Sequence, residues 1–197
     1  FMSIESQLGV ELEKPTCNLC DSSQSIALLS GTDVRRRGPG RFTVVRCIEC
    51  GLVYTSPRPT PEAILAYYPE DYAPHGVRAP DLAEGLYYRY FRLLGLSPGA
   101  RVLDVGCGGG SYLRFLESRG YQVAGTEVDA ALVEKLVHAG LEVRQGSLPE
   151  IPFPDQSFDA VTLWWVLEHA HDPLAALENA RRVLRPGGML VVSLQSF

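Results

Sequence analysis

Four of the five cysteines lie in two closely spaced pairs near the N-terminus. Cys17 is followed by Cys20, and Cys47 is followed by Cys50 at the same spacing. Two such pairs can bring four thiolates to one tetrahedral centre, which is the ligand set of a structural Zn²⁺ site. The 26 residues between the pairs are somewhat more than the roughly 15 to 20 that are common in this pattern. The cysteines therefore predict a metal site.

Two other interpretations of these cysteines are weaker. Two unrelated pairs of buried thiols would leave a short segment with too little core to fold, whereas bound Zn²⁺ supplies on the order of 10 kcal/mol of folding free energy. A redox pair would open a helix after a strand, and neither pair does so. Cys107 lies apart from them, in a glycine-rich loop, and we expect it to be a small loop residue rather than a nucleophile.

That loop, Asp104-Val105-Gly106-Cys107-Gly108-Gly109-Gly110, is the second candidate site. Its glycines let the chain backbone approach a ligand closely. Position 111 is serine instead of the third glycine of the dinucleotide fingerprint, and Asp104 places a carboxylate that is unfavourable beside a pyrophosphate and suits a cationic ligand. Glu127 follows about 20 residues later, where an acidic side chain can accept hydrogen bonds from both hydroxyls of a ribose.

The elements that position these residues alternate between strands and helices, which predicts an α/β domain with a Rossmann-like, doubly wound, mostly parallel sheet. We expect strands at 101–105, 122–126, 141–144, 158–164 and 189–194. The helix after Asp129 should bury a stripe of Leu132, Val133, Leu136 and Val137, and the helix that Asp172-Pro173 opens should face the sheet with Leu174, Leu177, Val183 and Leu184.

The remaining residues divide into two segments. Residues 1–57 form a small zinc-ribbon-like domain, with short strands at 26–29, 42–46 and 52–54 around the cysteines. Residues 58–99 form a helical linker and tyrosine-rich lid: Thr60-Pro61 starts a helix that Pro69 ends, and Asp81 caps a second helix. The alternative to a lid over a ligand is that the tyrosines pack between these helices. Residues 100–197 are the α/β domain.

Composition bounds the function. The 197 residues are 46% apolar and 21% charged with a net charge of −5, which excludes disorder and gives no basic field for nucleic acid or anionic lipid. Arg35, Arg36, Arg37 and Arg41 form the one basic cluster, either a solvated loop or an anion-binding surface. No membrane span or signal peptide is apparent, so we expect a soluble, cytoplasmic protein.

Residues 100–197 resemble the class I S-adenosylmethionine (SAM)-dependent methyltransferases. LDVGCGGG is similar to the first motif of that family, VAGTEVD to its second, and the stretches ending in LEHAHDP and RRVLRPGGMLVVS to its fourth and fifth strands. The resemblance implies SAM as cofactor, with Gly106 and Gly108 at its methionine portion, Asp104 acting on its ammonium, Glu127 on its ribose, Val128 on adenine, and Ser147 and Leu148 beside the adenine edge. The whole predicted cofactor site is Asp104, Gly106, Cys107, Gly108, Glu127, Val128, Ser147, Leu148, Trp164 and Tyr72.

The N-terminal stretches RCIECGLVY and YYPEDY resemble a subset of these enzymes that act on sugars or other small metabolites, which implies a small-molecule acceptor. His169, just after the fourth expected strand, is the candidate general base, because histidine exchanges protons readily near neutral pH; a structural role in the turn is the alternative. Other candidate functions are an RNA methyltransferase that reads RNA with its zinc ribbon, a SAM-binding protein without catalysis, and a nicotinamide-dependent oxidoreductase.

The last expectation concerns length. A class I sheet has seven strands, and this sequence reaches the fifth, so we expect a fragment or an incomplete record that binds cofactor without efficient turnover. Its apolar sheet edge would then be free to form a homodimer.

Overall fold

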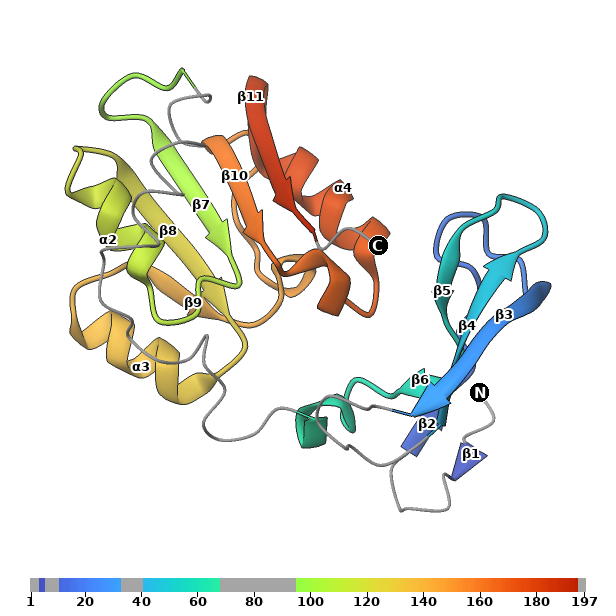
Figure 1. Cartoon of the computed structure of the whole chain (residues 1–197). Coiled ribbons are helices and arrows are strands. Elements are labelled where there is room, and N and C mark those ends of the chain that lie inside the picture. Colours follow the sequence, from blue (N-terminus) through green and yellow to red (C-terminus); the bar gives the residue numbers. More distant parts are fainter. Residues whose placement is uncertain (1–3, 6–10, 33–40, 68–94, 195–197) are drawn as a thin grey trace. The chain divides into compact units, whose positions relative to one another are not determined.

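The computed structural model describes residues 4–5, 11–32, 41–67 and 95–194 (Figure 1). The chain separates into two compact units, residues 1–70 and 71–197. The expected second helix of the linker, Tyr72 and the arginines at 35–37 lie outside the described residues.

The N-terminal unit contains two small antiparallel sheets. The first has the order β3-β4-β5, formed by Ser25–Thr32, Arg41–Cys47 and Val53–Thr55. All three expected strands are confirmed: β3 is twice as long as expected, β4 is one residue longer at each end, and β5 is shifted by one residue. Val45 lies at its centre, opposite Ala27 and Tyr54, and is buried. The sequence did not predict the second sheet, which joins β1 (Ile4–Glu5), β2 (Glu11–Glu13) and β6 (Arg58–Pro59).

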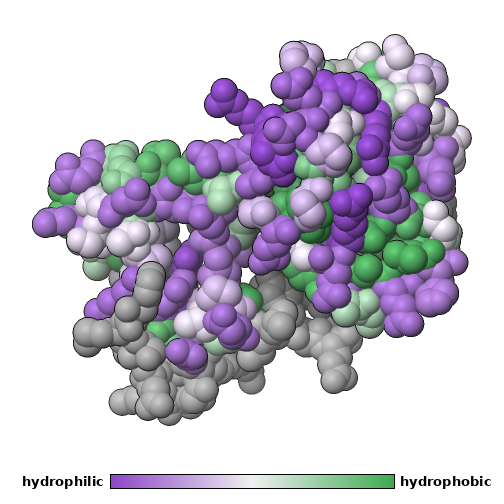
Figure 2. All heavy atoms as spheres, turned by 180° about the vertical axis from the view of Figure 1, so that it is seen from behind, coloured by the Kyte–Doolittle hydropathy of each residue, from purple (hydrophilic) through white to green (hydrophobic). Residues whose placement is uncertain are grey.

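Apolar side chains reach the surface among hydrophilic ones in both units (Figure 2). In the N-terminal unit β3 is exposed along its whole length. The large apolar side chains that are exposed there are Leu19, Ile26, Leu28, Leu29, Ile48 and Val53.

The short helix expected after Thr60 begins as predicted and takes the 3-10 form. The carbonyl oxygen of Thr60 accepts hydrogen bonds from the amides of Ala63 and Ile64, at 3.1 and 3.0 Å, as a helix start requires. The described chain then forms only the single 3-10 turn η1, Ile64–Tyr67. The short helix expected between Thr60 and Pro69 is thus a 3-10 turn over Ile64–Tyr67, and Pro69 lies outside the described residues.

The C-terminal unit is built on a five-stranded sheet in which every neighbouring pair is parallel (Figure 1). Its order is β11-β10-β7-β8-β9, from strands Leu184–Ser193, Phe158–Trp164, Arg101–Val105, Gln122–Glu127 and Val143–Gln145. The order reverses on the two sides of β7, so the sheet is doubly wound as expected. In such a sheet ligands bind beyond the carboxyl ends of the strands at the point of reversal, which here is the end of β7.

Helices cover both faces of the sheet. On one face, α2 (Ser111–Glu117) buries Tyr112, Phe115 and Leu116 against Val102 and Ala160, and α3 (Ala130–His138) packs beside it through Leu136. On the other face, α4 (Pro173–Val183) and the 3-10 turn η4 (Leu148–Glu150) enclose a larger core with Leu103, Phe158 and Val161. Among the described residues no helix is both long and apolar enough to cross a lipid bilayer.

Two details of helix packing differ from expectation. Val137 is 51% exposed and Leu174 is 37% exposed, so neither belongs to the buried stripe of its helix. The helices touch the sheet along narrower lines, Leu132 and Leu136 in α3 and Ala176, Ala180 and Val183 in α4. Small alanines suit this close contact of α4, because they let a helix axis approach the sheet.

The last strand also begins earlier than the sequence indicates. Leu184 pairs with Phe158, but the next paired residue is Met189, opposite Ala160. Arg185, Pro186, Gly187 and Gly188 therefore form the irregularity between these pairs, which is where the sequence predicts a turn.

Candidate functional site

The four paired cysteines meet at one point of the N-terminal unit. Their sulfur atoms all lie within 4.8 Å of one another. The shortest separations join the two pairs: Cys17 Sγ is 3.4 Å from Cys50 Sγ, and Cys20 Sγ is 3.5 Å from Cys47 Sγ. Four sulfurs at about 2.3 Å from a tetrahedral Zn²⁺ would be spaced by a little under 4 Å, so this cluster has the dimensions of a closed site with four cysteine ligands.

The two cysteine loops have matching backbone geometry. In the first, the amide of Cys17 donates to the carbonyl of Ser22 at 2.9 Å, and the amide of Asp21 donates to that of Cys17 at 2.8 Å. In the second, the amide of Cys47 donates to the carbonyl of Leu52 at 2.9 Å, and the amide of Gly51 donates to that of Cys47 at 3.1 Å. Each loop turns at a residue of positive φ, Asp21 at 57° and Gly51 at 81°. The two loops therefore hold their cysteine pairs in the same backbone geometry, facing one common point.

The thiols do not ionise alike. The backbone amide of Cys50, with help from neighbouring thiols, lowers the pKa of Cys47 to about 6. A backbone hydrogen bond at Ser22 lowers the pKa of Cys20, but desolvation and the adjacent thiols outweigh it and raise that pKa to about 12. Thiols packed this closely resist joint ionisation, and a bound cation is what allows all four to be thiolates together.

The glycine-rich loop of the C-terminal unit is fastened to the end of β8. The amide of Gly106 donates to Thr126 Oγ1 at 3.3 Å, and the amide of Cys107 donates to the Thr126 carbonyl at 2.9 Å. Gly106 has a φ of +66°, and a Cβ there would lie 2.6 Å from Cγ2 of Val166. These amides are therefore bonded within the protein and do not form the free row that cradles a pyrophosphate.

Glu127 closes the same end of the sheet with a buried carboxylate. Its Oε2 accepts from the amide of Gly108 at 2.9 Å, and its Oε1 accepts from the amides of Val128 and Asp129 at 2.8 and 3.1 Å. The residue is only 6% exposed. A carboxylate has about four acceptor positions, so three bonds fix its orientation and leave capacity for a ligand hydroxyl.

Asp104 is the second buried carboxylate, at 3% exposure. Thr162 Oγ1 donates to its Oδ1 at 2.6 Å. Burial raises the pKa of Asp104 to about 7; the Thr162 hydrogen bond opposes that shift and the negative charge of Glu127 adds to it. The partners of both carboxylates are hydroxyl and amide groups rather than basic side chains. Two acidic groups gathered at one loop in this way favour a cationic ligand over an anionic one.

Two of the other predicted cofactor residues have buried side chains. Cys107 is 8% exposed, and its sulfur lies where a Cβ on Gly125 would meet it at 2.8 Å. Burial raises the pKa of the Cys107 thiol well above its usual range, which disfavours the thiolate. Leu148 is 1% exposed and belongs to the core beneath η4.

Other predicted residues remain accessible. Val128, directly after Glu127, is 60% exposed, as an apolar surface for a flat base would be. Ser147 is half-buried and caps η4, and its amide donates to Glu150 Oε2 at 2.9 Å. Trp164 is half-buried with its ring edge-on to Tyr112 at a centroid distance of 5.4 Å, so it packs largely into the core.

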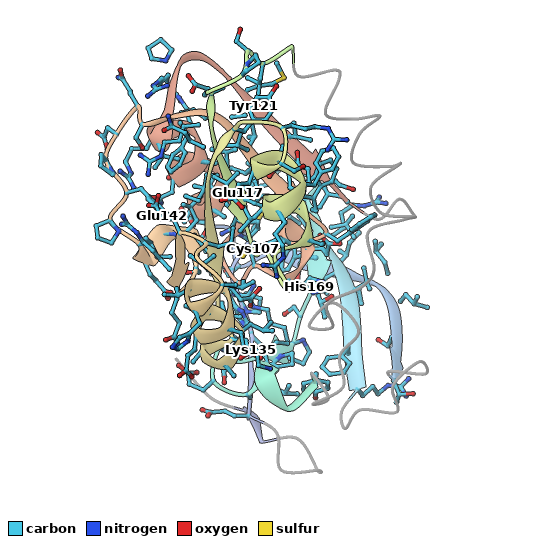
Figure 3. The ribbon with its side chains drawn as sticks, turned by 90° about the vertical axis from the view of Figure 1, so that its left-hand side faces the viewer. Cys107, Glu117, Tyr121, Lys135, Glu142 and His169 are labelled. Atoms are coloured by element: carbon cyan, nitrogen blue, oxygen red, sulfur yellow. The ribbon has the colours of Figure 1, made fainter. Side chains whose placement is uncertain are left out.

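His169 lies in the 3-10 turn η5, Leu167–His169, which follows β10. It is exposed, and its backbone amide donates to the Val166 carbonyl at 2.9 Å. His169 and Cys107 lie toward one end of the unit, whereas Tyr121, which precedes β8, lies at the opposite end (Figure 3). The packing of Val166 on Gly106 thus places the histidine turn next to the glycine loop.

Sequence reasoning missed Thr126 and Thr162. Both are buried, at 1% and 0% exposure, and each bonds a residue that the sequence did single out. A hydroxyl residue inside an apolar strand is the signal that could have found them, because a buried hydroxyl requires a partner.

Comparisons with known proteins agree with this geometry. A family model described as a methyltransferase domain matches residues 103–192. The chain is 35% identical over 122 residues to a probable S-adenosylmethionine-dependent methyltransferase of Mycolicibacterium smegmatis, covering 58% of this chain and 48% of that protein. It is 40% identical over 107 residues to a ubiquinone biosynthesis O-methyltransferase of Alkalilimnicola ehrlichii, covering 51% and 43%.

Among solved structures, that of the cyclase SpnF superposes with a TM-score of 0.50 at 30% identity, covering 55% of this chain and 44% of that one. The chain spans about half the length of the curated relatives it matches. Three observations point to the same family: the match over residues 103–192, the strand order of the sheet, and the buried carboxylates of Asp104 and Glu127 beside the glycine-rich loop. The C-terminal unit of this chain is a class I S-adenosylmethionine-dependent methyltransferase domain.

Proposed function

We propose that this protein binds SAM at the carboxyl end of β7 and β8 and transfers its methyl group to a hydroxyl of a small molecule. The observation that carries the proposal is the pair of buried carboxylates, Asp104 and Glu127, at a loop whose amides are already bonded within the protein. The similarity to an O-methyltransferase supports a hydroxyl acceptor.

The residues fit this cofactor. The buried Asp104 carboxylate complements an ammonium group, and the oriented Glu127 carboxylate complements a ribose diol. The exposed Val128 offers an apolar face for adenine, and Ser147, the N-cap residue of η4, is the residue expected at the adenine edge. SAM supplies, when bound, a methyl group on a positively charged sulfur that an oxygen can attack directly.

The chain's own task is to align the acceptor and remove its proton. Alignment of two reactants accounts for a large part of the rate of such displacements, so no covalent intermediate is required. His169 is the candidate base, since it is exposed on η5 beside the glycine loop. As base it would accept the hydroxyl proton as the oxygen attacks.

A second candidate is cofactor binding without methyl transfer. The similarity to a protein called a cyclase shows that this fold also occurs in proteins with a different named activity. Binding and turnover therefore need separate measurements.

We propose in addition that the four clustered cysteines hold one structural Zn²⁺. The supporting observations are their mutual distances and the two matching loops. Elemental analysis of purified protein should give one zinc per chain, and Cys47→Ser should lose the metal. Folded protein with a metal content near zero would contradict this.

The test of the main proposal is calorimetry with SAM, S-adenosylhomocysteine (SAH) and NAD. SAM and SAH should bind with 1:1 stoichiometry and NAD should not. Glu127→Ala should weaken SAH binding by roughly 1 to 3 kcal/mol through the lost hydrogen bonds, whereas Glu134→Ala, an exposed position on α3, should not change it. Binding of NAD without a response to either sulfur nucleoside would refute the proposal.

A further inference from the structure

Trp165 has a backbone conformation that tryptophan rarely adopts. Its φ is +54°, in the left-handed region that favours glycine, and only Asp21 and Gln156 share positive φ among the non-glycine residues described. Bulky side chains are strained there, and such strain persists where the surrounding structure enforces it, often at functional sites.

The surrounding structure does enforce it. The amide of Trp165 donates to the Ser193 carbonyl of β11 at 3.0 Å, which fixes the backbone just after β10 ends. On either side, Trp164 packs edge-on against Tyr112, and Val166 packs against the glycine loop at Gly106. Both neighbours thus turn inward, and the indole between them is left 44% exposed.

The position of this indole is that of a ligand contact. It follows the carboxyl end of β10, the strand next to β7, and it precedes by one residue the side chain that touches Gly106. The cofactor residues proposed above, Asp104 and Glu127, end β7 and β8 at the same edge of the sheet. A merely solvent-facing position would not need a strained tryptophan, because glycine would occupy it without strain.

The exposed indole of Trp165 limits the chemistry of its partner. It offers a flat apolar face whose only hydrogen-bonding group is one N–H. A sugar would lose hydrogen bonds of its hydroxyls to water against such a surface. A flat unsaturated ring has few such bonds to lose and stacks favourably on an indole face.

We propose that Trp165 is a specificity residue of the acceptor site, where its indole stacks on a flat unsaturated ring that carries the hydroxyl to be methylated. This inference rests on the proposed function, since it names the acceptor class of the same site. It also separates the roles of the two adjacent tryptophans: Trp164 packs in the core, and Trp165 meets the acceptor.

The test uses the whole chain saturated with SAH, catechol as the aromatic probe and methyl glucoside as the sugar probe. Catechol should bind and quench tryptophan fluorescence in the wild type, and methyl glucoside should not bind. By calorimetry, Trp165→Ala should weaken catechol binding at least tenfold, and Trp165→Phe, which keeps a ring, by less than threefold. SAH affinity should stay within twofold in both variants. Val137→Ala, at an exposed apolar position on α3, should change the affinity for neither catechol nor SAH.

Trp165→Gly checks the conformational argument separately. The alanine and glycine variants both lack the ring, so their difference reports backbone strain, and the glycine variant should melt at the higher temperature. Unchanged catechol affinity in Trp165→Ala, or an equal loss of SAH affinity, would overturn the assignment to the acceptor site. Binding of methyl glucoside but not catechol would overturn the proposal that the acceptor is a flat unsaturated ring. If the wild type does not bind SAH, the proposed function itself fails.

Discussion

Thr162 and Asp104 lie directly opposite each other on neighbouring parallel strands, β10 and β7, and the threonine hydroxyl donates to the aspartate carboxylate at 2.6 Å. Both side chains are buried. The pair thus places a polar contact inside the sheet, at the strand end that leads into the glycine loop. A carboxylate in this position weakens the fold when it ionises, and its charge suits a ligand of opposite charge.

Asp104→Asn should therefore stabilise the C-terminal unit at high pH while weakening SAH binding. The folded state raises the pKa of Asp104 from 3.8 to about 7, mainly by burial. A raised pKa means that the wild type loses unfolding free energy as the pH rises from about 4 to 7, and asparagine does not ionise. At pH 8 the variant should be more stable by roughly 4 kcal/mol, since the pKa rises by about three units at about 1.36 kcal/mol each, and near pH 4 the difference should vanish.

Urea unfolding at both pH values, followed by tryptophan fluorescence, measures this, since both tryptophans lie in the C-terminal unit. Thr162→Ser, which keeps the hydroxyl, is the matched control and should retain the wild-type pH dependence. If the unfolding free energies of Asp104→Asn and the wild type changed equally with pH, burial would not be penalising the ionised Asp104 carboxylate.

A second prediction concerns the fit between the glycine loop and β8. A Cβ on Gly125 would lie 2.8 Å from Cys107 Sγ and 2.9 Å from Leu113 Cδ1. Gly125→Ala should therefore destabilise the C-terminal unit by about 1 to 3 kcal/mol through overpacking. Cys107→Ala removes one of the two obstructing atoms, so the double variant should be more stable than the sum of the single effects predicts. Strict additivity in urea unfolding would contradict direct contact.

The sequence predicted the C-terminal fold well because its signals are local. The helices α3 and α4 are each opened by a recognisable residue, and Asp129 and Asp172 both accept the expected amide bonds in the structure. The Pro186-Gly187-Gly188 turn appears as the irregularity at the start of β11. When strands and helices with such clear boundaries alternate along the chain, few sheet topologies are possible.

The features that the sequence did not predict depend on distant partners. Thr162 gains its role from Asp104, 58 positions earlier, and no local pattern joins them. The sheet of β1, β2 and β6 has strands of two or three residues, too short for an alternating pattern. Val137 follows helical spacing but lies beyond the line along which α3 touches the sheet, so periodicity alone overstates the buried face.

His169→Ala tests the proposed base. With catechol as acceptor, kcat should fall by roughly 10² to 10⁴, the usual contribution of a general base, while SAH affinity stays unchanged. His138→Ala is the control, because His138 is exposed on α3 and its ring bonds to the Glu134 carbonyl of the same helix. A fall in SAH affinity that accounts for the whole loss of rate would instead place His169 at the cofactor. An unchanged kcat would leave proton removal to water.

The last prediction uses the two matching cysteine loops as each other's control. Gly51 and Asp21 occupy equivalent turns with positive φ, and a Cβ on Gly51 would meet no atom within 4 Å. Gly51→Ala should therefore act through backbone strain alone and cost the N-terminal unit about 1 kcal/mol. Asp21→Gly should stabilise the N-terminal unit, because it removes a side chain from the same strained backbone conformation.

Zinc retention against a chelator measures both changes. Gly51→Ala should release zinc faster than the wild type, and Asp21→Gly should release it no faster. Gly31→Ala is the control for a glycine replaced in the same unit, since its φ is not in the positive region and its surroundings are open. Equal release from Gly51→Ala and Gly31→Ala would show that the positive φ of the cysteine loop does not matter for holding the metal.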